Sequence, residues 1–311
     1  MYKKKEITFN STNLTDTLKG VAYIPIDSEI KGILQICHGM CEYIERYEPF
    51  AEFLCNNGYI VCGHDHVGHG KVAYEKNKLG YFAPQNGWQI LVDDLYKFTR
   101  IIKDMFPQYP LFLMGHSMGS FIARLYASYY TSATDGLIIS GTGSKNPAAG
   151  AGILLCDAVK ASKGEMYRSK KINDIAFGSF NKKYQNPKNN FEWLTRDEKI
   201  VEKYMNDPLC MFTFTVSAFK DLFTLNKEAN ESTVFKNTKS DMPIFILSGD
   251  MDPVGNYGKG VKAVYSNYLK NAKKDVSLKL YKDGRHEMVN ELNKEEVFND
   301  ILNWLNEKNK C

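Results

Sequence analysis

The sequence predicts an α/β protein with a mostly parallel, doubly wound sheet and an inserted helical segment. Two observations carry this prediction. Short apolar runs, which suit strands buried on both faces of a parallel sheet, alternate with amphipathic stretches through most of the 311 residues. The alternation stops between about residues 143 and 237, where helical patterns and Lys-rich segments occur without convincing strand pairs. Such an interruption inside an α/β pattern indicates an inserted subdomain.

The order of the elements follows from these patterns. Residues 5–10 and 18–25 alternate with period two and predict an antiparallel pair of opening strands. Four short apolar runs then predict buried strands at Gly32–Cys37, Tyr59–Gly63, Leu111–Gly115 and Gly136–Ser140. Amphipathic stretches between them predict helices near 46–57, 88–106 and 118–130. After the interruption we expect strands at Pro243–Ser248 and 276–282, and helices at 259–271 and 295–308.

The interruption divides the chain into three expected segments. Residues 1–142 form the first part of the α/β core, residues 143–235 form a helical cap insertion, and residues 236–311 form the second part of the core. A chain of this length holds either about two typical domains or one large α/β domain with an insertion.

Composition excludes several classes of protein. The chain is 43% hydrophobic, and its net charge of +4 is too small and too dispersed to suggest nucleic acid. No apolar run reaches the roughly 18 residues of a membrane span, and no apolar signal region follows the basic start. The seven cysteines are scattered without a C-x-x-C pair, which favours free thiols in a reducing compartment. We therefore expect a cytoplasmic protein without a transmembrane segment.

The pattern with the most chemical content follows the strand predicted at Leu111–Gly115. It reads Gly115-His116-Ser117-Met118-Gly119 and leads into an amphipathic helix. A G-x-S-x-G run between a strand and a helix predicts a tight turn that projects the serine hydroxyl above the sheet edge. The two glycines remove side chains that would clash in this turn, and the helix aims its N-terminal amides at the reaction centre. Ser117 is the predicted nucleophile.

A serine hydroxyl needs a base and a carboxylate, which follow it in the chain order Ser, Asp, His on this kind of turn. His286 is the only histidine in the sequence after Ser117. Two carboxylates, Asp250 and Asp252, follow the strand predicted at Pro243–Ser248. We choose Asp252, because its spacing places it beyond the strand end, where the loop turns toward the histidine. Asp250 is expected to accept hydrogen bonds from turn amides.

An oxyanion hole is predicted after the strand at Gly32–Cys37. The glycine of His38-Gly39-Met40 lets the backbone bend there, so that the N–H of Met40 faces the N–H of Met118 across the developing oxyanion. We expect His38 to have a structural role, with its ring bonded to nearby backbone.

Three further histidines, His64, His66 and His69, raise the question of zinc. No acidic or cysteine ligand set completes this cluster, and Gly68 and Gly70 indicate a turn. We therefore expect no metal site.

With these motifs placed, the sequence resembles the α/β-hydrolase superfamily and, within it, the monoacylglycerol lipase and lysophospholipase group of serine aminopeptidase-like hydrolases. The segments that carry the resemblance in the core are His38–Glu42 with Arg46-Tyr47, Asp65–Gly70, and Gly284–Met288 with Asn290-Glu291. Val67 departs from the group's D-x-R-G-H-G turn, where a basic residue is usual. Within the insertion, Trp193–Asp197 and Asp207–Cys210 resemble bacterial members described as lysophospholipases.

The resemblance implies a serine hydrolase that cleaves carboxylic esters of single acyl chains, of the monoacylglycerol or lysophospholipid type. Ser117 would form an acyl-enzyme, His286 would act as base and acid, and Asp252 would hold the imidazole tautomer. The amides of Met40 and Met118 would stabilise the oxyanion. This chemistry requires no metal or organic cofactor, and the expected partner is a small lipid or ester.

The insertion would then lie as a cap over the site. Apolar residues recur along one predicted helical face at Phe212, Val216, Phe219 and Phe223. This stripe either packs the cap onto the core or lines an acyl pocket, in which case Val216 and Phe219 bind substrate. Transient contact of the cap with a membrane surface is also expected.

Other functions share this fold and motif set. A peptidase of the prolyl iminopeptidase type needs an acidic group in the cap for a substrate α-amine, and five acids are available: Glu165, Asp174, Glu192, Asp197 and Glu198. A ligand-binding protein can keep all three polar residues without turnover. Transfer of the acyl group to an alcohol instead of water is a third alternative.

Overall fold

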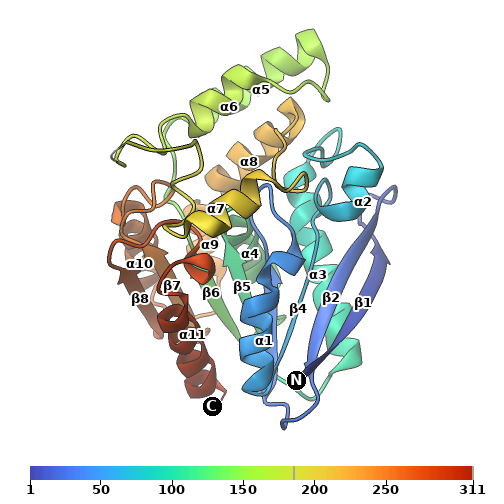
Figure 1. Cartoon of the computed structure of the whole chain (residues 1–311), viewed down its shortest axis with the longest axis vertical. Coiled ribbons are helices and arrows are strands. Elements are labelled where there is room, and N and C mark those ends of the chain that lie inside the picture. Colours follow the sequence, from blue (N-terminus) through green and yellow to red (C-terminus); the bar gives the residue numbers. More distant parts are fainter. Residues whose placement is uncertain (185, 310–311) are drawn as a thin grey trace.

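A computed structural model describes residues 1–184 and 186–309 of the chain. Its centre is one eight-stranded sheet with the order β1-β2-β4-β3-β5-β6-β7-β8 (Figure 1). The strands are β1 (Tyr2–Asn10), β2 (Thr17–Pro25), β3 (Gly32–Cys37), β4 (Tyr59–His64), β5 (Leu111–His116), β6 (Gly136–Ser140), β7 (Ile244–Gly249) and β8 (Val276–Tyr281). β2 pairs antiparallel with β1 and with β4, and the remaining pairs are parallel. The predicted mostly parallel, doubly wound sheet is confirmed.

The register of the central strands brings their carboxyl ends to one edge. Cys37 of β3 pairs with Gly115 of β5, and Gly115 pairs in turn with Ile139 of β6. The loops that leave β3, β5 and β6 therefore begin side by side. In open α/β sheets, a crevice at this edge is where ligands bind.

Helices cover both faces of the sheet (Figure 1). One face carries α1 (Glu48–Asn56) and α11 (Lys294–Lys308), and the other carries α3 (Gly87–Met105), α4 (Met118–Tyr129) and α10 (Lys259–Lys270). Alternation along β3 separates the two cores: Leu34 and Ile36 belong to the first, whereas Ile33 and Cys37 belong to the second. All six residues of β3 are buried, which explains why this strand has no polar face in the sequence.

Shorter helices complete the core. They are α2 (Gly70–Glu75) and two 3₁₀ turns, η1 (Ile44–Tyr47) and η2 (Met288–Asn290).

None of the helices in residues 1–184 and 186–309 is both long and apolar enough to cross a membrane. The six cysteines of this part of the chain are buried free thiols.

The segment between β6 and β7 is helical, and in its described residues it adds no strand to the sheet. Its helices are α5 (Ala149–Lys163), α6 (Lys170–Phe177), α7 (Glu198–Met205), α8 (Val216–Ala229) and α9 (Ser232–Asn237). Figure 1 shows α5 and α6 at the top of the molecule, with α7 and α8 between them and the sheet. We refer to residues 143–235 as the cap, whose exact boundaries stay a prediction.

A buried arginine joins the two ends of the cap to the core. Arg124 of α4 is fully buried and donates to the carbonyl of Gly143, where the cap begins. The bond to Gly143 comes from Nη1. Nη2 of the same guanidinium donates to the carbonyl of Ala229 and to the side chain of Asn230, where α8 ends. The ring of Phe235 lies 5.1 Å from its guanidinium carbon. These contacts hold both ends of the cap at the carboxyl edge of the sheet.

Candidate active site

Ser117 occupies a strained turn between β5 and α4. Its backbone has φ 53° and ψ −119°, a conformation that a residue with a side chain adopts only under constraint. A Cβ on Gly119 would collide with the carbonyl of Cys37, and a Cβ on Gly115 would collide with the carbonyl of Gly119. The turn therefore needs both glycines, as the sequence motif predicts. It exposes the Ser117 hydroxyl at the carboxyl edge of the sheet.

The structure brings Asp252 and His286 together. Asp252 follows β7 and His286 follows β8, and Nδ1 of the imidazole lies 2.9 Å from Oδ2 of the carboxylate. Asp252 has no exposed surface and also accepts from the Val254 N–H at 2.9 Å. Asp250 lies elsewhere, because its carboxylate accepts from the backbone N–H of Asp283 at 2.8 Å. The carboxylate beside the histidine is thus the one chosen from its spacing.

Electrostatics favour a basic imidazole at this position. Burial by itself would lower the pKa of His286, but attraction and hydrogen bonding from Asp252 raise that pKa above the ordinary 6.5. Among the described residues, Nε2 of His286 has no hydrogen-bond partner, and Ser117 lines the same cavity as His286. A hydroxyl, an imidazole and a buried carboxylate in this order can carry acyl transfer.

The segment after β3 supplies backbone amides next to Ser117. A Cβ on Gly39 would lie 3.1 Å from Cβ of Ser117, which measures how closely the two loops approach. Within residues 1–184 and 186–309, neither the N–H of Met40 nor that of Met118 donates to a protein acceptor, and both residues line the cavity. Two unpaired amides beside a hydroxyl are what an oxyanion hole requires.

A buried ionic cluster behind this segment was not recognised in the sequence. Arg46 donates to Glu42 at 3.1 Å and to Glu287 at 2.8 Å, and Glu287 is the residue after His286. Glu42 also accepts from the Gly39 N–H and from the Tyr47 hydroxyl. Burial raises the pKa of Glu42 to about 7. The spacing of Glu42 and Arg46 at i and i+4 was the available signal, but it did not identify Glu287 as a third partner.

Of the three histidines considered for zinc, His64 ends β4 with its ring packed against Phe9 and Phe98, and His66 and His69 lie in the loop that follows. Nε2 of His38 accepts from the His66 N–H at 3.0 Å, and Nε2 of His69 accepts from the Cys41 N–H at 3.3 Å. Burial lowers the pKa of His66 to about 4 and that of His69 to about 3, so both rings are neutral. The described residues contain no group of three or more His, Cys, Asp or Glu side chains arranged to hold a metal ion. The rings support the segment that carries Met40.

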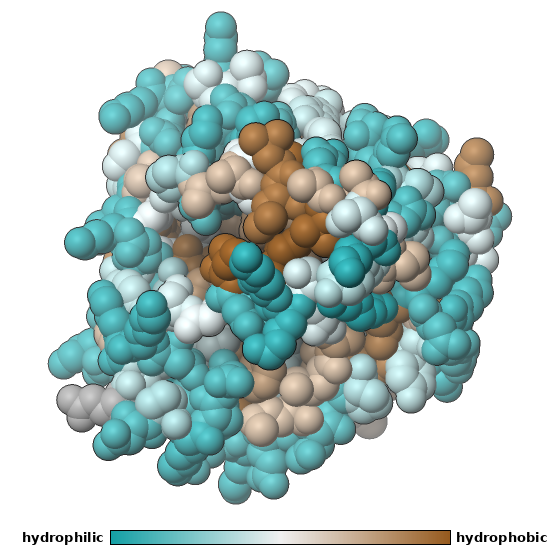
Figure 2. Space-filling view, turned by 90° about the horizontal axis from the view of Figure 1, so that it is seen from above, coloured by the Kyte–Doolittle hydropathy of each residue, from teal (hydrophilic) through white to brown (hydrophobic). Residues whose placement is uncertain are grey.

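A cavity of about 950 Å³ lies between this site and the cap. Ser117 and His286 form part of its floor, and the cap supplies most of its walls. The apolar lining residues of the cap include Leu155, Phe177, Phe180, Phe191, Trp193, Phe212, Leu222 and Phe223. Figure 2, which views the molecule from above, shows apolar side chains gathered around a hollow and bordered by hydrophilic residues. This is the composition of a site for a largely apolar ligand.

The expected roles of Val216 and Phe219 need correction. Both residues have no exposed surface and neither lines the cavity, whereas Phe212 and Phe223 do. The reason is that α8 begins only at Val216, with Thr215 as its N-cap, and packs between α5 of the cap and α3 and α4 of the core. Phe212 therefore precedes the helix. Of the four residues of the stripe, Phe212 and Phe223 line the cavity, and Val216 and Phe219 are buried away from it.

Fold and site together define an α/β hydrolase with a serine, histidine and aspartate at the carboxyl edge of the sheet. The chain belongs to the family described as serine aminopeptidase, S33, whose model matches residues 28–293. This membership confirms the family expected from the sequence.

Individual relatives are similar over nearly the whole chain. The monoglyceride lipase of Rattus norvegicus is 25% identical over 280 residues, which cover 89% of this chain and 81% of the relative. A monoglyceride lipase homolog of Monkeypox virus is 26% identical, over 88% of this chain and 89% of its own. A thermostable carboxyl esterase from Bacillus coagulans, solved in complex with glycerol, is 30% identical with a TM-score of 0.92, covering 98% and 99% of the two chains. These likenesses confirm the prediction of a carboxylic ester hydrolase.

Proposed function

We propose that the protein is a serine hydrolase that cleaves carboxylic esters of single acyl chains, of the monoacylglycerol or lysophospholipid type, through an acyl-enzyme. The observation that carries the proposal is the Asp252–His286 pair, whose imidazole opens with Ser117 onto one largely apolar cavity. The monoglyceride lipases and the carboxyl esterase among its relatives support the same chemistry.

The proposed reaction has two halves. His286 accepts the proton of Ser117 as the hydroxyl oxygen attacks the ester carbonyl, and the N–H groups of Met40 and Met118 stabilise the oxyanion. The imidazolium then gives its proton to the leaving alcohol as the ester C–O bond breaks. In the second half, a water molecule loses a proton to His286 and attacks the acyl-enzyme carbonyl. The bond between the acyl group and Oγ of Ser117 then breaks, the imidazolium returns its proton to Oγ, and the fatty acid leaves. Asp252 stabilises the imidazolium in both halves.

Cavity size supports a substrate with one chain. A volume of about 950 Å³ lies at the upper end of ordinary ligand pockets, which span about 300–1,000 Å³. One acyl chain and a small head group fit such a space, whereas the three chains of a triacylglycerol do not. We assign the acyl chain to the aromatic part of the cap lining, with Phe223 and Phe212 replacing Val216 and Phe219 as the expected contacts.

The surface of the cap suits the collection of such a substrate from a lipid surface. Leu154, Ile175 and Met211 are exposed apolar residues of the cap, with 71%, 60% and 44% of their surface accessible. Residues 143–190 carry nine Lys and Arg against three Asp and Glu. Exposed apolar side chains among cations favour transient contact with an anionic membrane surface. A cytoplasmic location stays a prediction.

The peptidase alternative has less support. Of the five candidate acids, Glu192 is bound to Arg285, Glu165 to Tyr81 and Glu198 to Lys188, and Asp197 caps α7. Asp174 does line the cavity, but it is paired with Lys170. Four of these five described carboxylates do not line the cavity, and the fifth, Asp174, lies in an exposed ion pair.

The proposal is tested by kcat/KM over p-nitrophenyl esters from acetate to dodecanoate and over a 1-monoacylglycerol, beside aminoacyl arylamides. We expect turnover of the esters with a maximum at medium chain length, and loss of turnover in Ser117→Ala. Retention of more than a few per cent of the activity by that variant would exclude Ser117 as the nucleophile. A maximum at acetate, or preference for the arylamides, would reject the proposed substrate class.

A further inference from the structure

A segment of the cap lies directly against the loop that carries His286. The backbone N–H of His286 donates to the carbonyl of Trp193 at 3.2 Å, and the next N–H, that of Glu287, donates to the carbonyl of Leu194 at 2.7 Å. The indole ring of Trp193 lies 5.0 Å from the imidazole, centroid to centroid, at an interplanar angle of 44°. The histidine is therefore contacted through its backbone and its ring by residues of the insertion.

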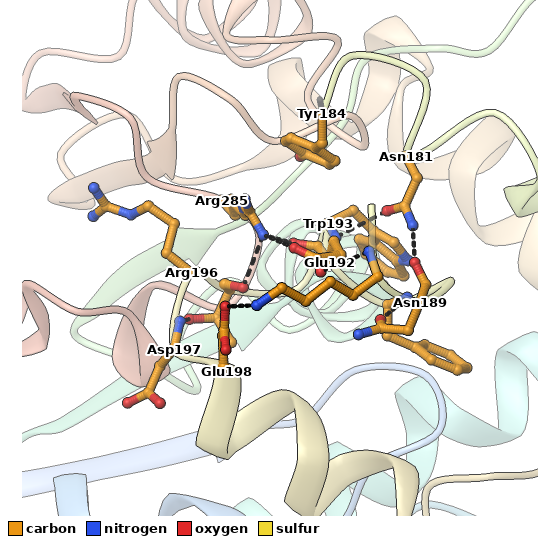
Figure 3. A network of polar contacts seen from close by, with 12 residues as sticks. Asn181, Tyr184, Asn189, Glu192, Trp193, Arg196, Asp197, Glu198 and Arg285 are labelled. Carbon is orange, nitrogen blue, oxygen red and sulfur yellow. Dashed lines mark hydrogen bonds and ion pairs between the residues drawn. The ribbon is translucent and has the colours of Figure 1, made fainter. Parts of the chain in front are cut away.

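Side chains of the histidine loop reinforce this contact. Figure 3 shows Arg285 directed toward Glu192. Its guanidinium donates to the Glu192 carboxylate at 3.1 Å, to the Glu192 carbonyl, and to the Thr195 carbonyl at 3.2 Å. The ring of Tyr184, also from the cap, lies 4.4 Å from the guanidinium carbon. The Tyr184 hydroxyl in turn donates to the carbonyl of Met251, the residue before Asp252, at 2.7 Å. The cap thus contacts the loops of both the base and the acid.

Glu291 connects the same two segments with one carboxylate. It has no exposed surface, and Oε1 accepts from the backbone N–H of Arg285 at 2.9 Å and from that of Arg196 at 3.1 Å. Oε2 accepts from Nε of Arg196 at 2.9 Å. One bond therefore reaches the residue before His286, and two bonds reach the cap.

The histidine loop has little regular structure of its own. Between the end of β8 at Tyr281 and the start of α11 at Lys294, its only helical turn is η2. Its order must therefore come from contacts with neighbouring segments. A displacement of about 1 Å in a reacting group can cost on the order of 100-fold in rate, so the origin of that order matters for catalysis.

We propose that residues Glu192–Arg196 of the cap, together with Arg285 and Glu291, are positioning residues that hold His286 in place for proton transfer. The proposal rests on the proposed function, in which His286 is the base. On this view the cap does more than bind the acyl chain. Breaking its contact with the histidine loop lowers turnover even for an ester too short to use the cavity walls.

The test compares two Glu→Gln variants, one at Glu291 and one at Glu198, of which Figure 3 labels Glu198. Glu291→Gln keeps the shape of the side chain and one accepting oxygen, but the NH2 group that replaces the other oxygen cannot accept from the donors that face it. Glu198→Gln is the matched control: its exposed carboxylate pairs with Lys188 and has no hydrogen bond or ion pair with a described residue of the histidine loop. For each variant, kcat and KM are measured on p-nitrophenyl acetate and p-nitrophenyl decanoate, and the folded state is checked by circular dichroism and thermal unfolding.

We expect Glu291→Gln to lower kcat roughly 10- to 100-fold on both esters by the same factor, with unchanged KM. The acid limb of its pH profile moves to lower pH, because a looser histidine loop weakens the attraction of Asp252. Glu198→Gln behaves as wild type. A loss confined to KM for the decanoate, or unchanged kcat on the acetate ester, would overturn the proposal.

Arg285 gives an independent test if Glu291→Gln does not fold. Arg285→Met keeps the apolar stem and removes all three donations to Glu192 and Thr195, and Arg285→Lys restores a donor that reaches fewer of these acceptors. We expect kcat on the acetate ester to fall in Arg285→Met and to recover in part in Arg285→Lys. Wild-type kcat in Arg285→Met would overturn the proposal. The proposed function fails separately, if wild type turns over no ester or if His286→Ala remains active.

Discussion

Nδ1 of His286 lies 2.9 Å from Oδ2 of Asp252, and the loops that carry the two residues are held by distant parts of the chain. Trp193 of the cap accepts from the backbone N–H of His286. On the other side, Arg46 of the core binds the carboxylate of Glu287, the residue after the histidine. The geometry of the pair therefore depends on both the core and the cap.

The choice between two neighbouring carboxylates leads to the first prediction. Asp252→Asn should lower kcat by a factor on the order of 10⁴, because an amide favours the wrong tautomer of the imidazole. Asp250→Asn should keep most of the activity, since Asp250 accepts only from turn amides such as that of Asp283. Steady-state kinetics beside thermal unfolding separate the two effects. A larger loss of kcat in Asp250→Asn, at unchanged folding, would show that Asp250 is the acid.

The pH profile gives the second prediction. In the proposed mechanism the neutral imidazole is the base, and Asp252 raises the pKa of His286 above 6.5 against the effect of burial. The acid limb of kcat/KM should therefore have its midpoint above pH 6.5, with activity falling as the pH is lowered through it. Glu287 and Glu42 add to the rise in pKa. In Asp252→Asn the midpoint of the residual activity should move to lower pH. A midpoint well below 6.5 in wild type would contradict this assignment.

The third prediction concerns the ionic cluster of Glu42, Arg46 and Glu287, which lies behind the segment that carries Met40. Arg46→Met leaves the carboxylates of Glu42 and Glu287 buried without their cation, which should lower the free energy of unfolding by about 3–5 kcal/mol. The loss should be larger at pH 8 than at pH 5, because the unpaired carboxyls have raised pKa values and become neutral in acid. Denaturant unfolding at the two pH values measures it. Arg100→Met, at an exposed site of α3, is the control and should change stability little.

The parts of the molecule that sequence predicts well are those set by local patterns. Buried strands such as β3 and β5 are continuous apolar runs, and the turn at Ser117 needs its two glycines for steric reasons that a motif records directly. Asp252 could be chosen over Asp250 because the end of β7 was located to within a residue. The catalytic roles of these residues remain predictions.

What the sequence did not provide are contacts between segments far apart in the chain. Glu42 and Glu287 are separated by 245 positions and share Arg46 only because two loops meet at the sheet edge. The stripe through Val216 and Phe219 has helical spacing, but spacing alone does not say whether a helix turns that face to a cavity or to the core. The structure shows that Val216 and Phe219 are buried and do not line the cavity.

The fourth prediction follows from that division of the stripe. Phe223 lines the cavity, whereas Phe219, one turn earlier on α8, has no exposed surface and does not. Each methylene moved from water into an apolar pocket contributes roughly 0.8 kcal/mol, so a wall that buries the chain raises kcat/KM with chain length. Phe223→Ala should therefore flatten the rise of kcat/KM from acetate to dodecanoate while leaving acetate nearly unchanged.

Phe219→Ala is the matched comparison for this prediction, with the same change on the same helix. It should preserve the dependence on chain length and lower the free energy of unfolding by about 3–5 kcal/mol, because it opens a cavity in the core. Kinetics over the p-nitrophenyl ester series and denaturant unfolding distinguish the two variants. If Phe219→Ala flattened the chain-length dependence and Phe223→Ala did not, the acyl chain would lie on the core side of α8, and the assignment of the aromatic cap lining to the substrate would be wrong.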